Sequence, residues 1–151
     1  KPKQRAVIVY DSMWGSTGIM ASAIASGLED EGVPVRIIDI QKNHHSDVMT
    51  ELADCGAVIV GSATHNNNVL PGIADVLTYM KGLRPLNRVG AAFGSYGWSG
   101  ESPKIIQEWL ASMNMDMPAD PVKCLFVPKH EGLSQCVALG KTVAEALKAK
   151  C

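Results

Sequence analysis

Short apolar segments recur along the chain at near-regular intervals, and each is about as long as a β-strand. Residues 6–10, 57–60 and 89–93 are almost wholly apolar, which is typical of parallel strands that are covered on both faces. Residues 35–40 and 123–127 contain polar side chains as well. Together these segments predict five strands.

The intervals between the expected strands carry apolar residues at helical spacing. The first helix is expected to end before Gly32, which suits the left-handed residue at a helix end. A short second helix follows Ser46, and a third begins at Pro71 and ends at Gly82. The last is expected from about residue 133 to 150. The apolar stripes of the first, third and fourth helices consist of Met20, Ala23, Ile24, Gly27, Leu28, Ile73, Val76, Leu77, Met80, Ile105, Ile106, Trp109, Leu110 and Met113.

Five alternations of strand and helix predict an α/β domain with a parallel sheet and right-handed crossovers. A length of 151 residues suits one domain, which we place at residues 5–151, after a linker remnant at residues 1–4. The net charge is -1, so no strong field for nucleic acid is expected. No apolar run approaches the ~20 residues of a membrane span, so neither nucleic acid nor membrane is an expected partner.

The cysteine and histidine residues indicate neither disulfides nor a metal site. The four cysteines form no CxxC pair, and we expect reduced thiols of a cytoplasmic protein. Cys55 and Cys124 border or lie in apolar runs and are expected in the core. His44 and His45 are adjacent on an expected loop and His130 is remote, so we predict no metal site.

Three connections between the expected elements have an unusual composition. In open parallel sheets, ligands bind beyond the carboxyl ends of the strands, where the strand order reverses. By analogy with such folds we expect the order 2-1-3-4-5, which makes the connections after the first, third and fourth strands neighbours. These connections, residues 11–17, 62–72 and 94–100, are rich in Ser, Thr, Asn, Gly and aromatic residues, whereas those after the second and fifth strands look plain.

The first connection has the composition of an anion site that lacks cationic side chains. It reads Ser12, Met13, Trp14, Gly15, Ser16 and Thr17 and leads into a helix. Backbone N–H groups at such a helix start bind an anion, and the helix dipole adds ~0.3–1 kcal/mol. Neutral donors alone suit a monophosphate rather than a nucleoside triphosphate with its Mg²⁺. An ordinary helix N-cap at Ser12 or Ser16 is the alternative.

The other two connections suit a flat ring with a polar edge. The connection at residues 94–100 includes Ser95, Tyr96, Gly97 and Trp98. Surface aromatic rings are costly unless covered, and a flat ligand would cover them by stacking; packing on neighbouring helices is the alternative. The connection at residues 62–72 includes Thr64, His65, Asn66 and Asn67, whose donors and acceptors suit a pyrimidine edge, although a plain surface turn has a similar composition. A monophosphate pocket, stacking positions and a hydrogen-bonding edge are the three parts that flavin mononucleotide (FMN) requires.

These residues resemble the phosphate loop of flavodoxins, in which Ser12, Gly15 and Thr17 match and Trp14 replaces a hydroxyl residue. Residues 9–17, 61–67 and 93–98 resemble more specifically the flavodoxin domain of flavodiiron proteins (A-type flavoproteins, rubredoxin:oxygen oxidoreductase-like). The resemblance spans the whole chain and implies a flavodoxin-like three-layer sandwich. It also implies FMN with residues 12–17 on the phosphate and residues 64–67 and 95–98 around the ring.

Two residues depart from the family pattern. Ala63 stands where proline is frequent, which affects the stiffness of the connection. His65 stands where an apolar residue is usual; it would couple reduction to pH if it lay beside the flavin, and a solvated loop histidine is the alternative.

The resemblance also implies a larger protein and a division of labour within it. An N-terminal metallo-β-lactamase-like domain would hold two irons and reduce dioxygen or nitric oxide, rubredoxin is the usual donor, and a homo-oligomer is left open. The redox chemistry belongs to the cofactor, so no catalytic residue is expected in this chain. We expect backbone groups of residues 62–68 at the N5 side of the ring, and an uncharged pyrimidine edge that lowers the second potential.

Three alternative functions share parts of this pattern. A phosphoacceptor receiver domain needs an aspartate at the end of the third strand, where Ser62 stands. An FMN-dependent NAD(P)H:quinone reductase would share the FMN loops and would oxidise NAD(P)H directly; no GxGxxG motif is present, but such enzymes often lack one. A free-standing flavodoxin carrier is the third alternative. The basic N-terminus without an initiator Met favours an excised module instead.

Overall fold

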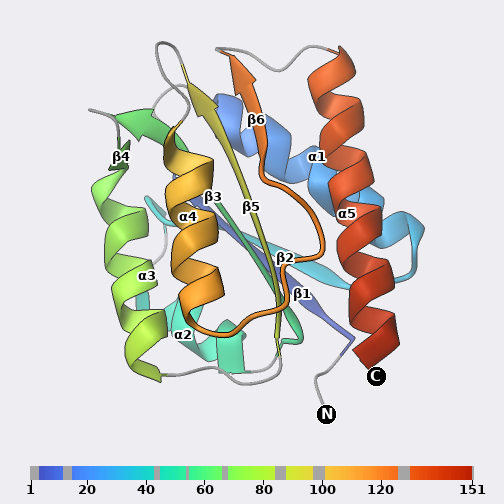
Figure 1. Ribbon diagram of the computed structural model, residues 1–151, viewed down its shortest axis with the longest axis horizontal. Helices are drawn as coiled ribbons and strands as arrows, with labels where there is room; N and C mark the ends of the chain where they lie inside the picture. The colour runs from blue at the N-terminus through green and yellow to red at the C-terminus, as the bar shows by residue number, and fades with distance from the viewer. Residues whose placement is uncertain are drawn as a thin grey trace.

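The fold is described by a computed structural model covering residues 4–11, 15–42, 45–53, 55–65, 68–83, 88–96, 101–125 and 130–150. Strands and helices alternate along it, as Figure 1 shows. The elements are β1 (Ala6–Asp11), α1 (Ser16–Asp30), β2 (Val35–Asp39), α2 (His45–Ala53), β3 (Ala57–His65), β4 (Asn68–Val69), α3 (Pro71–Leu83), β5 (Val89–Tyr96), α4 (Glu101–Ser112), β6 (Val122–Leu125) and α5 (His130–Lys150).

Five parallel strands form the sheet in the order β2-β1-β3-β5-β6. Since β5 and β6 are the fourth and fifth parallel strands along the chain, the expected order 2-1-3-4-5 is confirmed. The short strand β4 pairs antiparallel with the end of β3, and this hairpin was not expected. Strand order therefore reverses between β1 and β3, which is where a ligand site is expected in such a sheet.

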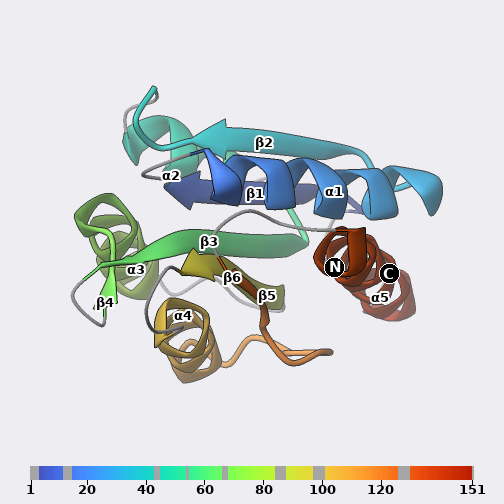
Figure 2. The same cartoon turned by 90° about the horizontal axis from the view of Figure 1, so that it is seen from above.

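Helices cover both faces of the sheet, which makes the fold a three-layer sandwich (Figure 2). On β1, Ala6 and Ile8 face α1 and α5, whereas Val7 and Val9 face the layer of α2, α3 and α4. All four are fully buried, as the near-continuous apolar composition of the strand predicts. Cys55 and Cys124 lie in these two cores, as expected.

Helices α1 and α5 pack closely because each has a glycine at their crossing. A Cβ atom on Gly27 would collide with the carbonyl oxygen of Val137, and one on Gly140 would collide with that of Ile24. The buried face of α5, which includes Val143, Ala144 and Leu147, therefore packs against α1 as well as the sheet.

Several expected boundaries were wrong. β3 runs on to His65 and β5 to Tyr96, so parts of the expected connections are strand. Gly15 occupies the N-cap position of the first helix, so Ser16 is not the N-cap, and Ser12 lies outside the described residues. His45 begins α2 rather than lying on a loop. Polar and glycine residues weaken strand propensity, but neighbouring strands supply backbone partners that override it.

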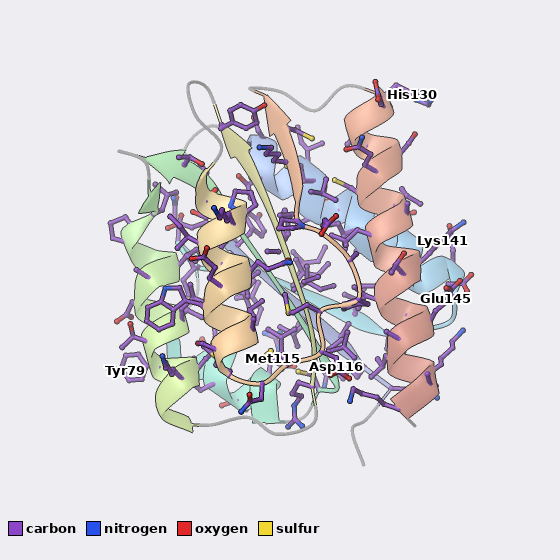
Figure 3. All side chains as sticks on the ribbon, in the orientation of Figure 1. Tyr79, Met115, Asp116, His130, Lys141 and Glu145 are labelled. Atoms are coloured by element: carbon purple, nitrogen blue, oxygen red, sulfur yellow. The ribbon has the colours of Figure 1, made fainter. Side chains whose placement is uncertain are left out.

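The carboxyl ends of the strands and the chain termini lie at opposite ends of the molecule. The arrowheads of β5 and β6 point to the end where α5 begins, and both chain termini lie at the opposite end (Figure 1). In Figure 3, His130 marks the first end, and Met115 and Asp116 mark the second. At the second end, Nζ of Lys150 lies 2.7 Å from Oδ2 of Asp116, and Arg5 is paired with Glu51 at 2.6 Å. No helix in the described ranges is both long and apolar enough to cross a membrane.

Candidate functional site

The three connections expected to form a site leave adjacent strands. Asp11 at the end of β1 is paired with Ser62 of β3, and Ser62 is paired with Gly94 of β5. Because the strands are parallel, all three chains emerge at the same edge of the sheet. The expected proximity of these connections is therefore confirmed. Seven of the expected site residues lie outside the described part of the chain: Ser12, Met13, Trp14, Asn66, Asn67, Gly97 and Trp98.

The described part of the first connection has the backbone geometry of an anion site. Gly15 has φ 85° and ψ −12°, which is left-handed, and Ser16 continues directly into α1. A left-handed residue next to a right-handed one turns successive N–H groups toward one point, and the helix start leaves N–H groups without intrahelical partners. The space beside the Gly15 Cα is open, since an added Cβ would meet nothing within 4 Å. The first turn carries no acidic side chain.

A hydroxyl–hydroxyl hydrogen bond joins the first connection to the third. Oγ1 of Thr17 lies 2.9 Å from Oγ of Ser95, and both residues are buried. Since one hydroxyl of the pair donates to the other, the second O–H remains a donor. This clasp on the α1 side of the sheet brings two expected site residues together and leaves a proton for a further acceptor.

The side chains of Tyr10 and Asp11, at the end of β1, are each hydrogen-bonded to a neighbouring residue. The pKa of Tyr10 is raised, first by burial and then by the neighbouring Asp39 carboxylate, which accepts a hydrogen bond from it. On the other face, Oδ1 of the buried Asp11 accepts a hydrogen bond of 2.7 Å from Nε2 of Gln41. Its Oδ2 lies 2.8 Å from where a Cβ of Gly72 would stand, so α3 begins against this carboxylate.

The second connection is a hairpin whose base is hydrogen-bonded to the sheet. Thr64 pairs with Val69, and His65 pairs with Asn68. The hydroxyl of Ser62 accepts a hydrogen bond of 2.9 Å from the backbone N–H of Leu70 and donates one of 2.8 Å to the carbonyl of Ala63. Part of the loop that the sequence predicted is therefore a hairpin, in which the expected edge residues Thr64 and His65 lie at the end of β3.

A lysine of a neighbouring strand lies beside the start of the third connection, which the sequence interpretation did not anticipate. Nζ of Lys123 lies 5.9 Å from the ring centroid of Tyr96, a cation–π distance. Lys123 comes from β6, a strand from which no site residue was predicted. Tyr96 is half-buried, so one of the two expected stacking rings already contacts a neighbouring strand.

Ser102, in the first turn of α4, is a site-edge residue that the sequence interpretation missed. It is fully buried and is hydrogen-bonded to the side chain of Thr64 and the backbone of Ser62. The helical stripe of α4 gave no signal for it, because a serine at a helix start is ordinary.

Possible metal ligands do not cluster in the described ranges. There, no group of three or more His, Cys, Asp or Glu residues is close enough to hold a metal ion. Cys124 and Cys136 contact each other as free, buried thiols. Burial raises the pKa of both, and for Cys136 to about 12. Both thiols are therefore protonated at neutral pH.

The sheet order and the glycine-led helix start on its carboxyl edge define an open α/β domain of the kind that binds a phosphorylated ligand. The sequence profile of the family described as Flavodoxin matches residues 8–140, and the chain belongs to this family. FMN is the cofactor of flavodoxin domains.

Two curated relatives have names that describe reductases. Rubredoxin-oxygen oxidoreductase of Megalodesulfovibrio gigas is 53% identical over 150 residues, which are 99% of this chain and 37% of the relative. Nitric oxide reductase of Moorella thermoacetica is 42% identical over 143 residues, which are 94% of this chain and 36% of the relative. The chain therefore spans little more than a third of the length of these relatives.

Three solved structures share the fold at high similarity. The rubredoxin oxygen:oxidoreductase from Desulfovibrio gigas superposes with a TM-score of 0.97 at 53% identity, covering 99% of this chain and 37% of that one. The flavodiiron protein from Giardia intestinalis gives 0.93 at 28% identity, with 99% and 37% covered. A flavodoxin from the domain Archaea gives 0.85 at 35% identity, with 95% and 99% covered.

Proposed function

We propose that this chain binds FMN at the carboxyl edge of its sheet and serves as an electron-transfer module. The observation that carries the proposal is the left-handed Gly15 at the start of α1, next to the hydroxyl clasp of Thr17 and Ser95. Backbone N–H groups, the helix dipole and one spare hydroxyl proton then converge on a phosphate without any cationic side chain in that connection.

In this proposal, the residues expected from the sequence contact the phosphate and the ring of FMN. Residues 12–17 hold the phosphate, and residues 64–67 and 95–98 frame the ring. When bound, FMN supplies the capacity to accept and pass on electrons. The protein's own contribution is to bind the phosphate, to orient the ring through the hairpin of β3 and β4, and to shield one ring face with the aromatic residues at and beyond the end of β5.

The whole protein, in this proposal, is a flavodiiron-type oxidoreductase. Support comes from relatives named rubredoxin-oxygen oxidoreductase and nitric oxide reductase, of which this chain covers about a third. A rubredoxin-type donor would reduce the FMN, which would pass electrons to a diiron metallo-β-lactamase-like domain that reduces dioxygen or nitric oxide. The free thiols of Cys124 and Cys136, in contact but unpaired, support a cytoplasmic location.

A free-standing flavodoxin carrier is the second candidate. The archaeal flavodoxin is matched over 99% of its own length, so a domain of this size also exists by itself. Electron transfer to a separately added diiron domain, without covalent linkage, would favour this candidate. The FMN site would be the same in both.

Titration of the apoprotein with FMN and with riboflavin tests the site. Gly15→Val is expected to lower the affinity for FMN at least tenfold and to abolish the preference for FMN over riboflavin, because a β-branched residue disfavours the left-handed backbone of the phosphate site. Gly32→Val is the matched control, since Gly32 has φ 78° and equally open space at the other end of α1. Stoichiometric FMN retained by the Gly15 variant, or none bound by the unchanged chain, refutes the proposal.

A further inference from the structure

A closed ring of hydrogen bonds joins the first turn of α4 to the end of β3. The hydroxyl of Ser102 donates a bond of 3.0 Å to the carbonyl oxygen of Ser62. It accepts one of 2.9 Å from the hydroxyl of Thr64. The backbone N–H of Ser102 donates in turn to Oγ1 of Thr64 at 3.2 Å. Ser102 is fully buried, so its hydroxyl depends on these partners.

The absence of a side chain on Gly94 makes room for this ring. A Cβ on Gly94 would stand 2.7 Å from Oγ of Ser102 and would collide with the carbonyl oxygen of Ser62. Gly94 and Ser62 are register partners on β5 and β3. The serine of α4 therefore lies across two strands of the carboxyl edge and touches both.

The ring secures one side of the hairpin base, and Ser62 secures the other. The hydroxyl of Ser62 accepts the bond from Leu70, the residue that follows β4, while its carbonyl accepts the bond from Ser102. Between these two contacts lie the end of β3 and β4, which pair with each other. Movement of Ser102 would therefore move the paired ends of these strands.

We propose that Ser102 is a positioning residue that sets where the hairpin at residues 62–70 stands against the flavin ring, and thereby tunes the redox potentials of FMN. The proposal rests on the proposed function. The proposed phosphate site includes the hydrogen bond between Thr17 and Ser95, which involves α1 on the other face of the sheet. Loss of the Ser102 hydroxyl should therefore change the environment of the flavin ring without changing the binding of the phosphate.

Ser102→Ala removes the hydroxyl that makes two of the three hydrogen bonds, so the Ser62 carbonyl loses the Ser102 donor and the Thr64 hydroxyl loses its acceptor. The bond from the backbone N–H of residue 102 to Thr64 can remain. An unsatisfied buried group relaxes toward any available partner, since leaving it unpaired is costly. The hairpin is expected to shift, and backbone groups that face the ring shift with it. Thr64→Val removes the other hydroxyl of the same ring at constant shape, so it should act in the same direction.

The test is to measure the two one-electron midpoint potentials of bound FMN in the unchanged chain and in variants. Ser102→Ala and Thr64→Val are expected to change the separation of the two potentials in the same direction, by at least a tenfold change in the equilibrium constant, or 59 mV. The double variant should change it by less than the sum. Ser112→Ala, on the same helix, is the matched control, because its exposed hydroxyl donates to the nearby Trp109 carbonyl at 2.6 Å.

The inference is overturned if the equilibrium constant given by the separation of the two potentials stays within threefold of the unchanged chain in both hydroxyl variants. It is also overturned if the Ser112 variant shows an equal change. Hydrogen exchange on the apoprotein is a second measurement, which does not depend on bound flavin. The amide of Leu70 should lose at least tenfold protection in Ser102→Ala and none in Ser112→Ala; unchanged protection refutes the positioning role. A chain that binds no FMN but shows this loss of protection would defeat the proposed function alone.

Discussion

The contact between Gly61 and Phe93 gives the sharpest test of how the carboxyl edge is packed. The two residues are register partners on β3 and β5. A Cβ on Gly61 would overlap Cζ, Cε1 and Cε2 of the Phe93 ring. Phe93 is fully buried, so the ring has no free space to enter. Gly61→Ala is therefore expected to destabilise the domain, although an exposed strand glycine would gain from the same change.

The size of the effect follows from overpacking. Forcing an extra carbon into a filled core costs about 1–3 kcal/mol, against a gain of roughly 0.5–1 kcal/mol from the loss of glycine freedom. We expect a net loss of about 1–2 kcal/mol in the free energy of unfolding, which corresponds to a fall in Tm of about 2–8 °C for a domain of this size. Phe93→Leu should relieve the collision, so the double variant should lose less than the sum of the singles.

Urea denaturation followed by circular dichroism measures these values, with an unchanged m-value as the check on two-state behaviour. The coupling between the two sites should be about 0.5–3 kcal/mol, as for residues in direct contact. A Gly61→Ala variant as stable as the unchanged chain, or strictly additive effects of the two substitutions, would show that the ring does not occupy the space assigned to it.

Three further predictions concern the thiols, the helix crossing and the hydroxyl clasp. Cys136 has its pKa raised to about 12 by burial first and the adjacent thiol second, from 9.0. As the pH rises, the unfolded chain therefore loses this proton before the folded chain does. The free energy of unfolding should fall by about 1.4 kcal/mol per pH unit between pH 9 and 12. In urea titrations at pH 8 and pH 10, the Cys136→Ala variant should lose less stability between the two pH values than the unchanged chain. Gly140→Ala should destabilise by about 1–3 kcal/mol because the helix backbones touch there, whereas Gly82→Ala, with open space, should stabilise slightly; thermal melts that rank them otherwise contradict the close crossing. Thr17→Val should cost about 1–3 kcal/mol by leaving the buried Ser95 hydroxyl unpaired, and adding Ser95→Ala should cost little more in the same urea assay.

The apolar runs of β1, β3 and β5 were readable because a strand buried on both faces needs a nearly continuous apolar sequence. The ends of these strands were not readable. Ser62 and Gly94 belong to residue types that occur often in turns, and their backbone partners on neighbouring strands keep them extended. The hairpin formed with β4 was missed for the same reason.

The sequence by itself determined the class of domain, because strand and helix periodicity are local properties. The strand order was expected by analogy with such folds, and it makes the ends of β1, β3 and β5 neighbours. Tertiary structure alone decided which side chains hold that site together. Thr17 meets Ser95 across 78 positions, Thr64 meets Ser102 across 38, and Lys123 reaches Tyr96 from another strand. Such pairs leave no periodic trace in the chain, since each depends on the packing of elements that fold far apart in sequence.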